Sequence, residues 1–239
     1  QAALARVGTA GNAEIRAESR GAIGFARLLN GELDAAFANV NSGLQILKDA
    51  GLSDQNRPLR AKLHAIAAQV LETAGYLDEA ETRMAFGFEL APERFDLGRA
   101  LAVMKLEAGD ADGAAAVFQP FLTGPRAREA GIDQACVLIQ GGRFEDGLAM
   151  LEVLVPQLVG EVHLRSNLIG RTCLAAAYIT LDRLQEADEV LVGAREAILR
   201  YPDPHLAWRV HLLDGQVNAL AGYWFEAAGA LRQALSRFM

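Results

Sequence analysis

The sequence predicts an all-α protein, a right-handed α-α superhelix (a helical solenoid) of about six helix-turn-helix repeats. Ala and Leu, both strong helix formers, are abundant in a 239-residue chain that is 51% apolar and only 7% aromatic. Runs of β-branched residues, which favour strands, are nearly absent. A pattern recurs six times: a turn residue, a small residue five positions later, and a large apolar residue four positions after that.

The turn residue of the pattern is glycine in five repeats and aspartate in one. In chain order the turn residues are Gly31, Gly75, Gly109, Gly142, Asp182 and Gly222, separated by 44, 34, 33, 40 and 40 positions. A nearly fixed period in this range indicates a helical solenoid. Each turn residue is expected to end the first helix of its repeat in a left-handed conformation. Acidic residues soon after it favour the start of the second helix.

The small and large positions have a packing reason. Two antiparallel helices lie closest just after a tight turn, so a large side chain there would overpack, at a cost of about 1–3 kcal/mol. A residue four positions later lies one helical turn away on the same face and fills the wider gap. The small residues are Ala36, Ala80, Ala114, Gly147, Ala187 and Ala227, and the large ones are Val40, Met84, Phe118, Leu151, Leu191 and Leu231.

We therefore expect one continuous domain over residues 1–239. Its repeats are predicted at about 15–50, 58–92, 94–124, 127–160, 163–201 and 204–239, and residues 1–11 are predicted to be the end of a preceding helix. Pro202 and Pro204 stop one helix and prepare the next. None of the connections has the composition of a flexible linker.

The units resemble tetratricopeptide repeats (TPR), whose pattern is W-x2-L-G-x2-Y…A-x3-F…P. Tyr178 stands at the Tyr position, Ala114-x3-Phe118 reproduces A-x3-F, and Pro92 closes its unit. No unit carries the early Trp. The small position of the first helix holds Gly24, Ala68, Ala102, Ala135, Ala175 and Gly215. Repeats longer than the 34-residue consensus are similar to arrays attached to bacterial signalling ATPase regulators or to caspase-like CHAT proteases.

Charge and hydropathy disfavour two classes of partner. The net charge of −7 and the pI near 5.2 oppose binding to a nucleic-acid backbone, and the chain has no run of five basic residues. The sequence has no run of 18 apolar residues, so it predicts no membrane span, and no signal peptide is visible. We expect a cytoplasmic protein, with the periplasm as the alternative if an N-terminal signal was removed.

Sequence motifs of catalysis or cofactor binding are absent, so we expect no enzyme activity, no cofactor and no metal site. The chain has no phosphate-binding glycine loop, no H-E-x-x-H and no C-x-x-C. Cys136 and Cys173 lie in apolar helical segments, which favours two buried structural thiols over a disulfide or a metal pair. The four histidines are His64, His163, His205 and His211. The last two are six positions apart, a spacing that does not place them on the same helix face.

The resemblance to TPR proteins implies a concave groove lined by the first helix of each repeat. Counting back from the turn residues predicts its lining as Phe25, Leu28, Gln69, Glu72, Arg99, Val103, Leu106, Ile132, Ile139, Gln140, Ile179, Leu212 and Gln216. The Lys, Asn and Arg with which some family members clamp a peptide carboxylate are missing. An apolar groove suits an amphipathic helix or an extended apolar segment of a partner, although the same residues could instead be core.

Two functional hypotheses follow, with a groove enzyme as a third, less favoured one. In the first, the chain is a non-catalytic scaffold that binds a peptide or helix of a partner protein. In the second, it is a regulatory or sensor arm of a larger signalling protein or protease and contacts its own effector domain. Self-association through the C-terminal helix is a further expectation, because Leu231, Leu235 and Phe238 lie on one face there. Trp208, Tyr223 and Trp224 are candidate contact residues.

Overall fold

The computed structural model describes residues 2–158, 160 and 164–238, with side chains from Asn12 onward except those of His205, Arg237 and Phe238. Within these residues the chain is helical and contains no strand. His163 and the predicted repeat bounds at 163 and 239 lie outside the described residues. The helices are α1 (Ala2–Leu29), α2 (Leu33–Asp49), α3 (Arg57–Thr73), α4 (Leu77–Leu90), α5 (Phe95–Glu107), α6 (Ala111–Ala116), η1 (Gln119–Phe121), α7 (Ala127–Gln140), α8 (Phe144–Leu154), η2 (Val155–Gln157), α9 (Leu164–Thr180), α10 (Leu184–Arg200), α11 (Pro204–Leu220) and α12 (Trp224–Phe238).

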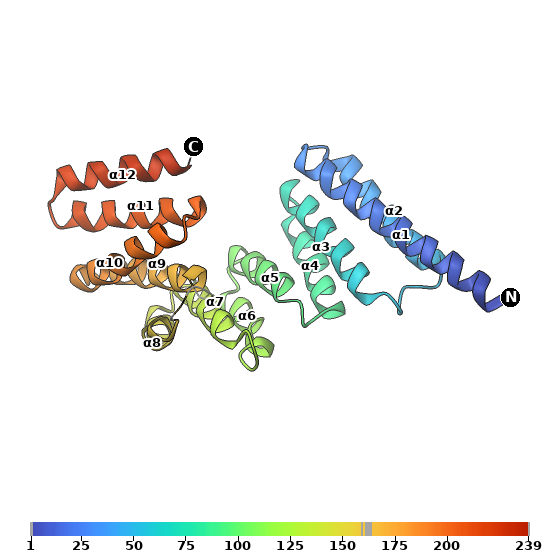
Figure 1. The fold of residues 1–239 in the computed structure, drawn as a ribbon, viewed down its shortest axis with the longest axis horizontal. Helices are drawn as coiled ribbons and strands as arrows, with labels where there is room; N and C mark the ends of the chain where they lie inside the picture. Colours follow the sequence, from blue (N-terminus) through green and yellow to red (C-terminus); the bar gives the residue numbers. More distant parts are fainter. Residues whose placement is uncertain (1, 159, 161–163, 239) are drawn as a thin grey trace. The chain divides into compact units, whose positions relative to one another are not determined.

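Helices pack mainly against their neighbours in the sequence. The pairs α1/α2, α3/α4, α7/α8, α9/α10 and α11/α12 form helical hairpins, and α11 and α12 lie side by side in Figure 1. The second helix of one repeat then packs on the first helix of the next, as α2 does on α3 and α10 on α11. The predicted array of helix-turn-helix repeats is confirmed.

The turn residues adopt the predicted left-handed conformation. The five glycines have φ between 77° and 86°, and Asp182 is the one non-glycine residue with positive φ among the described residues, at 57°. At Gly75 the amide donates to the Glu72 carbonyl at 3.0 Å, and the next amide, of Tyr76, donates to the Leu71 carbonyl at 2.9 Å. These bonds satisfy carbonyl groups that the end of α3 would otherwise leave free.

The small position after each turn is buried in all six repeats, as predicted. Gly147 shows the reason most directly: a Cβ at this residue would lie 2.7 Å from the Ala135 carbonyl oxygen of the paired helix. The large position four residues later is fully buried in the first five repeats, at Val40, Met84, Phe118, Leu151 and Leu191.

The chain forms two compact units, Gln1–Ala108 and Gly109–Met239, and each has its own core. In the first unit, Val40 and Leu47 of α2 pack with Leu63 and Ile66 of α3. In the second, side chains of α7 to α11 form one large cluster. The expectation that all six repeats make one continuous domain stays a prediction.

The first helix differs from its prediction. Residues 2–11 were expected to end a preceding helix, but α1 runs without interruption from Ala2 to Leu29. The glycines of α1 lie inside the helix, as the sequence pattern predicted for Gly24. Gly21 and Gly24 are buried where Leu63 and Val40 approach the α1 backbone, so they serve helix packing.

Candidate functional site

A row of side chains on the first helices of the first unit marks its candidate site. The row six residues before the turn residues holds Phe25, Gln69 and Val103. Phe25 is 42% exposed and Val103 50% exposed, while Gln69 is half-buried. All three were predicted groove residues, and their exposure leaves them accessible to a partner.

A hollow of about 460 Å³ lies in this surface, between α1, α3 and α5. Phe25 and Gln69 line it, together with side chains that sequence reasoning did not select. We call the apolar part of its lining the floor, and this part includes three alanines. The remaining lining residues are Ala22, Lys62, Ala65, Ile66, Met84, Arg94, Asp96, Leu97 and Ala100.

The charged groups at the edge of the hollow are paired with one another. The Lys62 Nζ lies 3.3 Å from the Glu18 carboxylate, and the Arg94 Nε donates to Asp96 Oδ1 at 2.8 Å. The hydrogen bond from Arg94 holds the pKa of Asp96 below its usual value, so this carboxylate stays ionised. The edge is therefore polar but locally neutral.

The predicted groove residue Glu72 lies outside this hollow. It lines a separate hollow of about 180 Å³ that also contains Asp78, Glu81 and Glu107. Burial, and next the charge of Glu107, raise the pKa of Glu72. The Glu81 carboxylate is already bound by Lys105 Nζ at 2.9 Å. Among the described residues, no group of three or more His, Cys, Asp or Glu side chains is arranged to hold a metal ion.

The other predicted groove residues of the first unit have mixed surroundings. Leu28, Arg99 and Leu106 are half-buried, and the Arg99 guanidinium lies over the Phe95 ring at 5.8 Å. They do not line the 460 Å³ hollow.

In the second unit, part of the predicted groove is core. Ile132 is 1% exposed and Ile139 6% exposed, and both belong to the main core cluster. These two side chains offer no surface to a partner. Gln140 and Gln216 are exposed, while Ile179 and Leu212 are half-buried.

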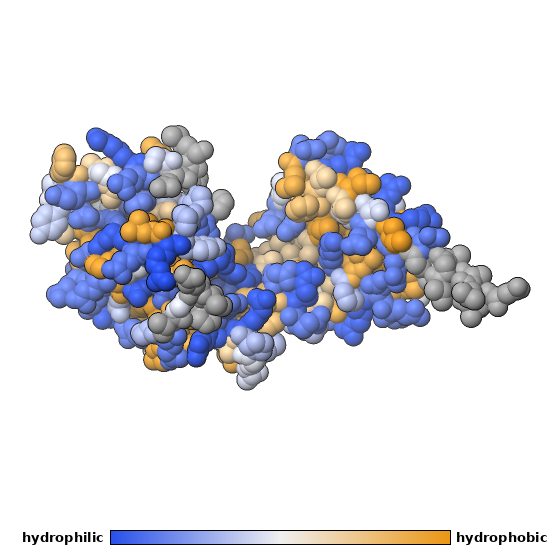
Figure 2. Space-filling view, viewed as in Figure 1, coloured by the Kyte–Doolittle hydropathy of each residue, from blue (hydrophilic) through white to orange (hydrophobic). Residues whose placement is uncertain are grey.

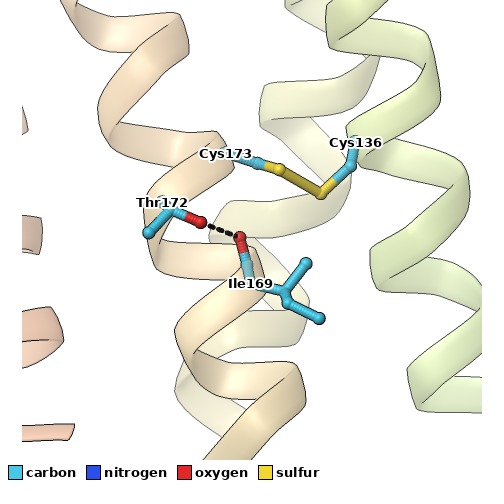
Figure 3. Close-up of a disulfide and its surroundings, with 4 residues drawn as sticks. All are labelled: Cys136, Ile169, Thr172 and Cys173. Carbon is cyan, nitrogen blue, oxygen red and sulfur yellow. Dashed lines mark hydrogen bonds between the residues drawn. A yellow bond between two sulfur atoms is a disulfide. The ribbon is translucent and has the colours of Figure 1, made fainter. Parts of the chain in front are cut away.

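The prediction of two free buried thiols is wrong. Cys136 of α7 and Cys173 of α9 form a disulfide, with their Cα atoms 5.7 Å apart (Figure 3). The bond joins the first helices of two successive repeats. Both cysteines are buried, and the neighbouring Thr172 hydroxyl donates to the Ile169 carbonyl at 2.9 Å. A separation of 37 residues hides this contact, because the repeat stacking brings the two helices together.

His64 is also structural. Its ring lies edge-on to Phe86, with centroids 4.7 Å apart, and its Nδ1 is 3.4 Å from Arg83 Nη1. Burial, followed by the charges of Arg83 and Arg60, lowers the pKa of His64 to about 4. The ring is neutral at pH 7 and fills the space between α3 and α4.

Comparison with solved structures decides the fold. A tetratricopeptide repeat protein from Parabacteroides merdae ATCC 43184 superposes with a TM-score of 0.55 over 93% of each chain, at 13% sequence identity. The chain has a TPR fold. Two other matches have lower TM-scores. Naa15/Naa10 bound to HypK-THB gives 0.44 at 19% identity, over 90% of this chain and 30% of that one. The P58(IPK) TPR domain gives 0.37 at 14% identity, over 92% and 74%.

Sequence comparison adds no relative: no family model matches this chain, and no curated protein matches it. In the part of the chain that the structure describes, no helix has both the length and the apolar character needed to cross a bilayer. The fold is therefore a helical repeat array of the TPR type.

The TPR geometry explains which site residues sequence reasoning missed. Lys62 and Asp96 lie thirteen residues before their turn residues, seven before the row that includes Gln69 and Val103. Seven residues are two helical turns, so extending the count would have placed both charges on the same face. The alanines of the floor carry no such signal, because alanine is common throughout the chain.

A second apolar hollow, of about 510 Å³, lies in the second unit between α7, α8 and the preceding loop. Arg128 is its only charged lining residue, and Leu122, Met150, Val153 and Leu154 are among the others. No predicted groove residue lines it. Figure 2 shows that apolar residues on the visible face form small patches among polar ones.

Proposed function

We propose that this chain is a non-catalytic interaction scaffold that binds a peptide or helix of a partner protein in the 460 Å³ hollow of the first unit. The observation that carries the proposal is the hollow itself. It lies on three first helices of a TPR fold and combines an apolar floor with a few polar groups. Binding sites commonly have this composition, in which the apolar surface supplies affinity and the polar groups fix orientation.

The chemistry of the hollow favours a partner segment with one bulky apolar anchor. Ala65 and Leu97 of the floor are buried side chains next to the opening, and Phe25 stands partly exposed beside them. An aliphatic or aromatic anchor would bury apolar surface against them, worth about 25 cal/mol per Å² removed from water. Since the edge charges are already paired, we expect the affinity to change little with salt.

Filling the hollow tests the proposal. Peptides from a displayed random library are selected on the wild-type chain and their Kd values are measured by fluorescence polarisation. Ala100→Trp, which places an indole in the hollow, should weaken the selected peptides at least tenfold. Ala38→Trp is the matched control, because Ala38 is an exposed helical alanine on α2 that does not line the hollow. It should leave Kd unchanged.

Two further results keep the test decisive. Gln69→Lys changes a half-buried lining residue without filling the floor, and it should also weaken binding. This variant therefore tests the hollow independently, even where Ala100→Trp disturbs folding. Circular dichroism reports the helicity of each variant. Selected peptides that bind Ala100→Trp and Gln69→Lys as tightly as wild type would overturn the proposal.

In the alternative, the chain is a regulatory arm that contacts its own effector domain. The hollow would then bind a segment of that domain in the same polypeptide. The wild-type chain would then select peptides that match a segment of the effector. Both functions share the hollow and differ in where its ligand is encoded.

The disulfide bears on the compartment. Disulfides persist in oxidising compartments and are rare in the cytosol of most organisms. The Cys136–Cys173 bond therefore favours the periplasmic alternative over the cytoplasmic expectation. Thiol labelling of the protein purified from its source, without reductant, tests this: two labelled thiols would restore the cytoplasmic assignment.

A further inference from the structure

A trough in the second unit joins the 510 Å³ hollow to another hollow, of about 450 Å³. The two hollows adjoin, because Ala149 and Met150 of α8 line both of them. The second helices α6 and α8 form two sides of the trough, and α7 forms another. The trough is therefore a different surface from the 460 Å³ hollow of the first unit, which lies on first helices.

The α6 side of the trough has few and small side chains because this helix is short. Helix α6 ends at Ala116 after six residues, whereas α2 has 17 and α4 has 14. Pro120 has no amide hydrogen to donate to the Ala116 carbonyl, so the α-helical bonding stops there. The residues of α6 that line the trough are Asp112, Ala115 and Ala116. Two of these three side chains are single methyl groups, which leaves room for a ligand beside α7 and α8.

One face of α7 runs along the trough. Its lining residues are Arg128 and Gly131 in the 510 Å³ hollow, and Gln134 and Leu138 in the 450 Å³ hollow. Spacings of three and four residues place them on one side of the helix. The helix rises about 15 Å between the first and the last of them. An extended peptide advances about 3.3 Å per residue, so the trough has the length of about five residues.

Gln134 is a buried amide whose oxygen has no partner in the described chain. Its side chain is only 6% exposed and lines the 450 Å³ hollow. The Nε2 donates to the Ala115 carbonyl at 3.0 Å, whereas Oε1 accepts no hydrogen bond from any described residue. A buried carbonyl oxygen without a donor costs free energy. This atom therefore favours a ligand that brings an N–H group into the hollow.

The opposite end of the trough carries an unpaired positive charge. Arg128 is exposed, and no described residue forms an ion pair or a hydrogen bond with it. At the end near Gln134, Arg143 is held between two carboxylates, with Nη1 2.5 Å from Asp112 and Nη2 2.6 Å from Asp146. An anionic group of a ligand is therefore favoured beside Arg128 and disfavoured at the end that has the two aspartates.

We propose that the trough binds an extended peptide segment of a partner protein, with a large apolar side chain next to an acidic residue. The apolar side chain occupies the 510 Å³ hollow, where Arg128 is the only charged lining residue. The acidic side chain pairs with Arg128. A backbone N–H about three residues away donates to Gln134 Oε1, because the two α7 residues are about 9 Å apart along the helix. This site goes beyond the hollow of the first unit and does not depend on it.

Selection with a pre-cleared library tests the trough by itself. Random displayed hexapeptides are first passed over the Ala149→Trp chain, in which an indole replaces an exposed methyl group that lines both hollows. The peptides that do not bind are then selected on the wild-type chain. Binders of the first-unit hollow are removed in the first step, because Ala149 lies in the other unit. Ala228→Trp is the matched control, at an exposed alanine of α12 that lines neither hollow, and should leave each Kd unchanged.

Charge reversal tests the chemistry of the ligand. The selected peptides should contain Asp or Glu next to a large apolar residue, and Arg128→Glu should weaken them about tenfold or more in fluorescence polarisation. Arg165→Glu makes the same charge change at an exposed arginine of α9 outside the trough and should leave Kd unchanged. The wild-type Kd should also rise with salt, because no group of the described chain neutralises Arg128.

Methylation of the peptide backbone tests the role of Gln134. Each amide of a selected peptide is N-methylated in turn, which removes one N–H at a time. At one position this should weaken binding to the wild-type chain about tenfold, but not binding to Gln134→Leu, which has lost the accepting oxygen. Circular dichroism verifies the helicity of every variant. The same methylation profile on both chains would contradict the assigned role of Gln134.

Two results would overturn the proposal as a whole. One is a pre-cleared library that enriches no peptide on the wild-type chain. The other is a set of selected peptides that Arg128→Glu binds as tightly as wild type, because their binding would not involve an anionic group. Peptides of the first-unit hollow are those that Ala149→Trp still binds, so the two proposals fail separately.

Discussion

The disulfide between Cys136 and Cys173 gives the sharpest prediction about stability. The bond closes a loop with a sequence separation of 37 residues, which contains α8 and the start of α9. In the chain-entropy model, closing a loop of this length lowers the entropy of the unfolded chain by an amount worth about 4 kcal/mol at 25 °C. Removing the cross-link should therefore lower the free energy of unfolding by about 2–4 kcal/mol.

Reduction isolates this contribution better than mutation does. The protein is unfolded in guanidinium chloride with a phosphine reductant, refolded with the reductant present, and compared with the oxidised protein. Both cysteine side chains then remain in place, so no cavity adds to the effect. Unfolding followed by circular dichroism at 222 nm gives the stability difference, and mass spectrometry confirms the redox state of each sample.

Hydrogen exchange locates the effect. Because each repeat contacts mainly its neighbours, the loss of protection should concentrate in α7 to α9 and spare α1 to α3. The double variant Cys136→Ala/Cys173→Ala is the control and should not respond to the reductant. Equal stabilities of verified oxidised and reduced protein would refute the entropic argument, and an equal change of protection in both units would refute its locality.

Three other predictions concern single positions. The pKa of about 4 for His64 lies below the unfolded value of 6.5, so its contribution is complete above pH 6.5 and is lost as pH falls through 4. Wild type should lose about 3 kcal/mol more than His64→Gln between pH 7 and 4 in urea unfolding, and parallel pH profiles would contradict this. Gly147→Ala should lower the free energy of unfolding by about 1–3 kcal/mol, because its methyl group meets the backbone of the paired helix. Gly229→Ala has open space around it and should raise that free energy by about 0.5–1 kcal/mol through helix propensity. Equal effects of the two substitutions would contradict the close approach at Gly147. Ile139→Glu should lower the free energy of unfolding by at least about 3 kcal/mol, because it places a carboxylate in the core. Val103→Glu, at an exposed position, should change it by no more than about 1 kcal/mol in thermal unfolding. The reverse order would contradict the burial of these two residues.

The turns and the hairpin packing could be predicted from the sequence because they depend on local rules. A left-handed residue and a small residue five positions later are needed wherever two antiparallel helices meet closely. Gly147 and Asp182 fulfil these roles in the structure as the sequence indicated. The unbroken length of α1 was not predicted, because residues 1–11 were expected to end a preceding helix.

The groove lining could be predicted only in part, because two sets of first-helix residues follow the same spacing and only one of them faces outward. Residues six before the turn point outward in the first unit, as Phe25 and Val103 do. Residues ten before the turn lie nearer the joint between repeats, and Ile132 and Thr172 are buried there. The same helical spacing contains both rows, so the sequence pattern alone could not divide them. The contact between the two cysteines was hidden for the same reason.

The alanine floor of the first unit supports a role in binding because it works against stability. Larger side chains at Ala65 or Ala100 would bury more apolar surface, and each added methylene that fits is worth about 0.8 kcal/mol. The second unit has a larger side chain at the equivalent position: Ile132 stands ten residues before its turn residue, as Ala65 does in the first unit, and it belongs to the core. A fold that fills this position with isoleucine in one unit can do so in the other. The open hollow is therefore a property of these particular residues and not of the repeat, which supports the proposal that it binds a partner.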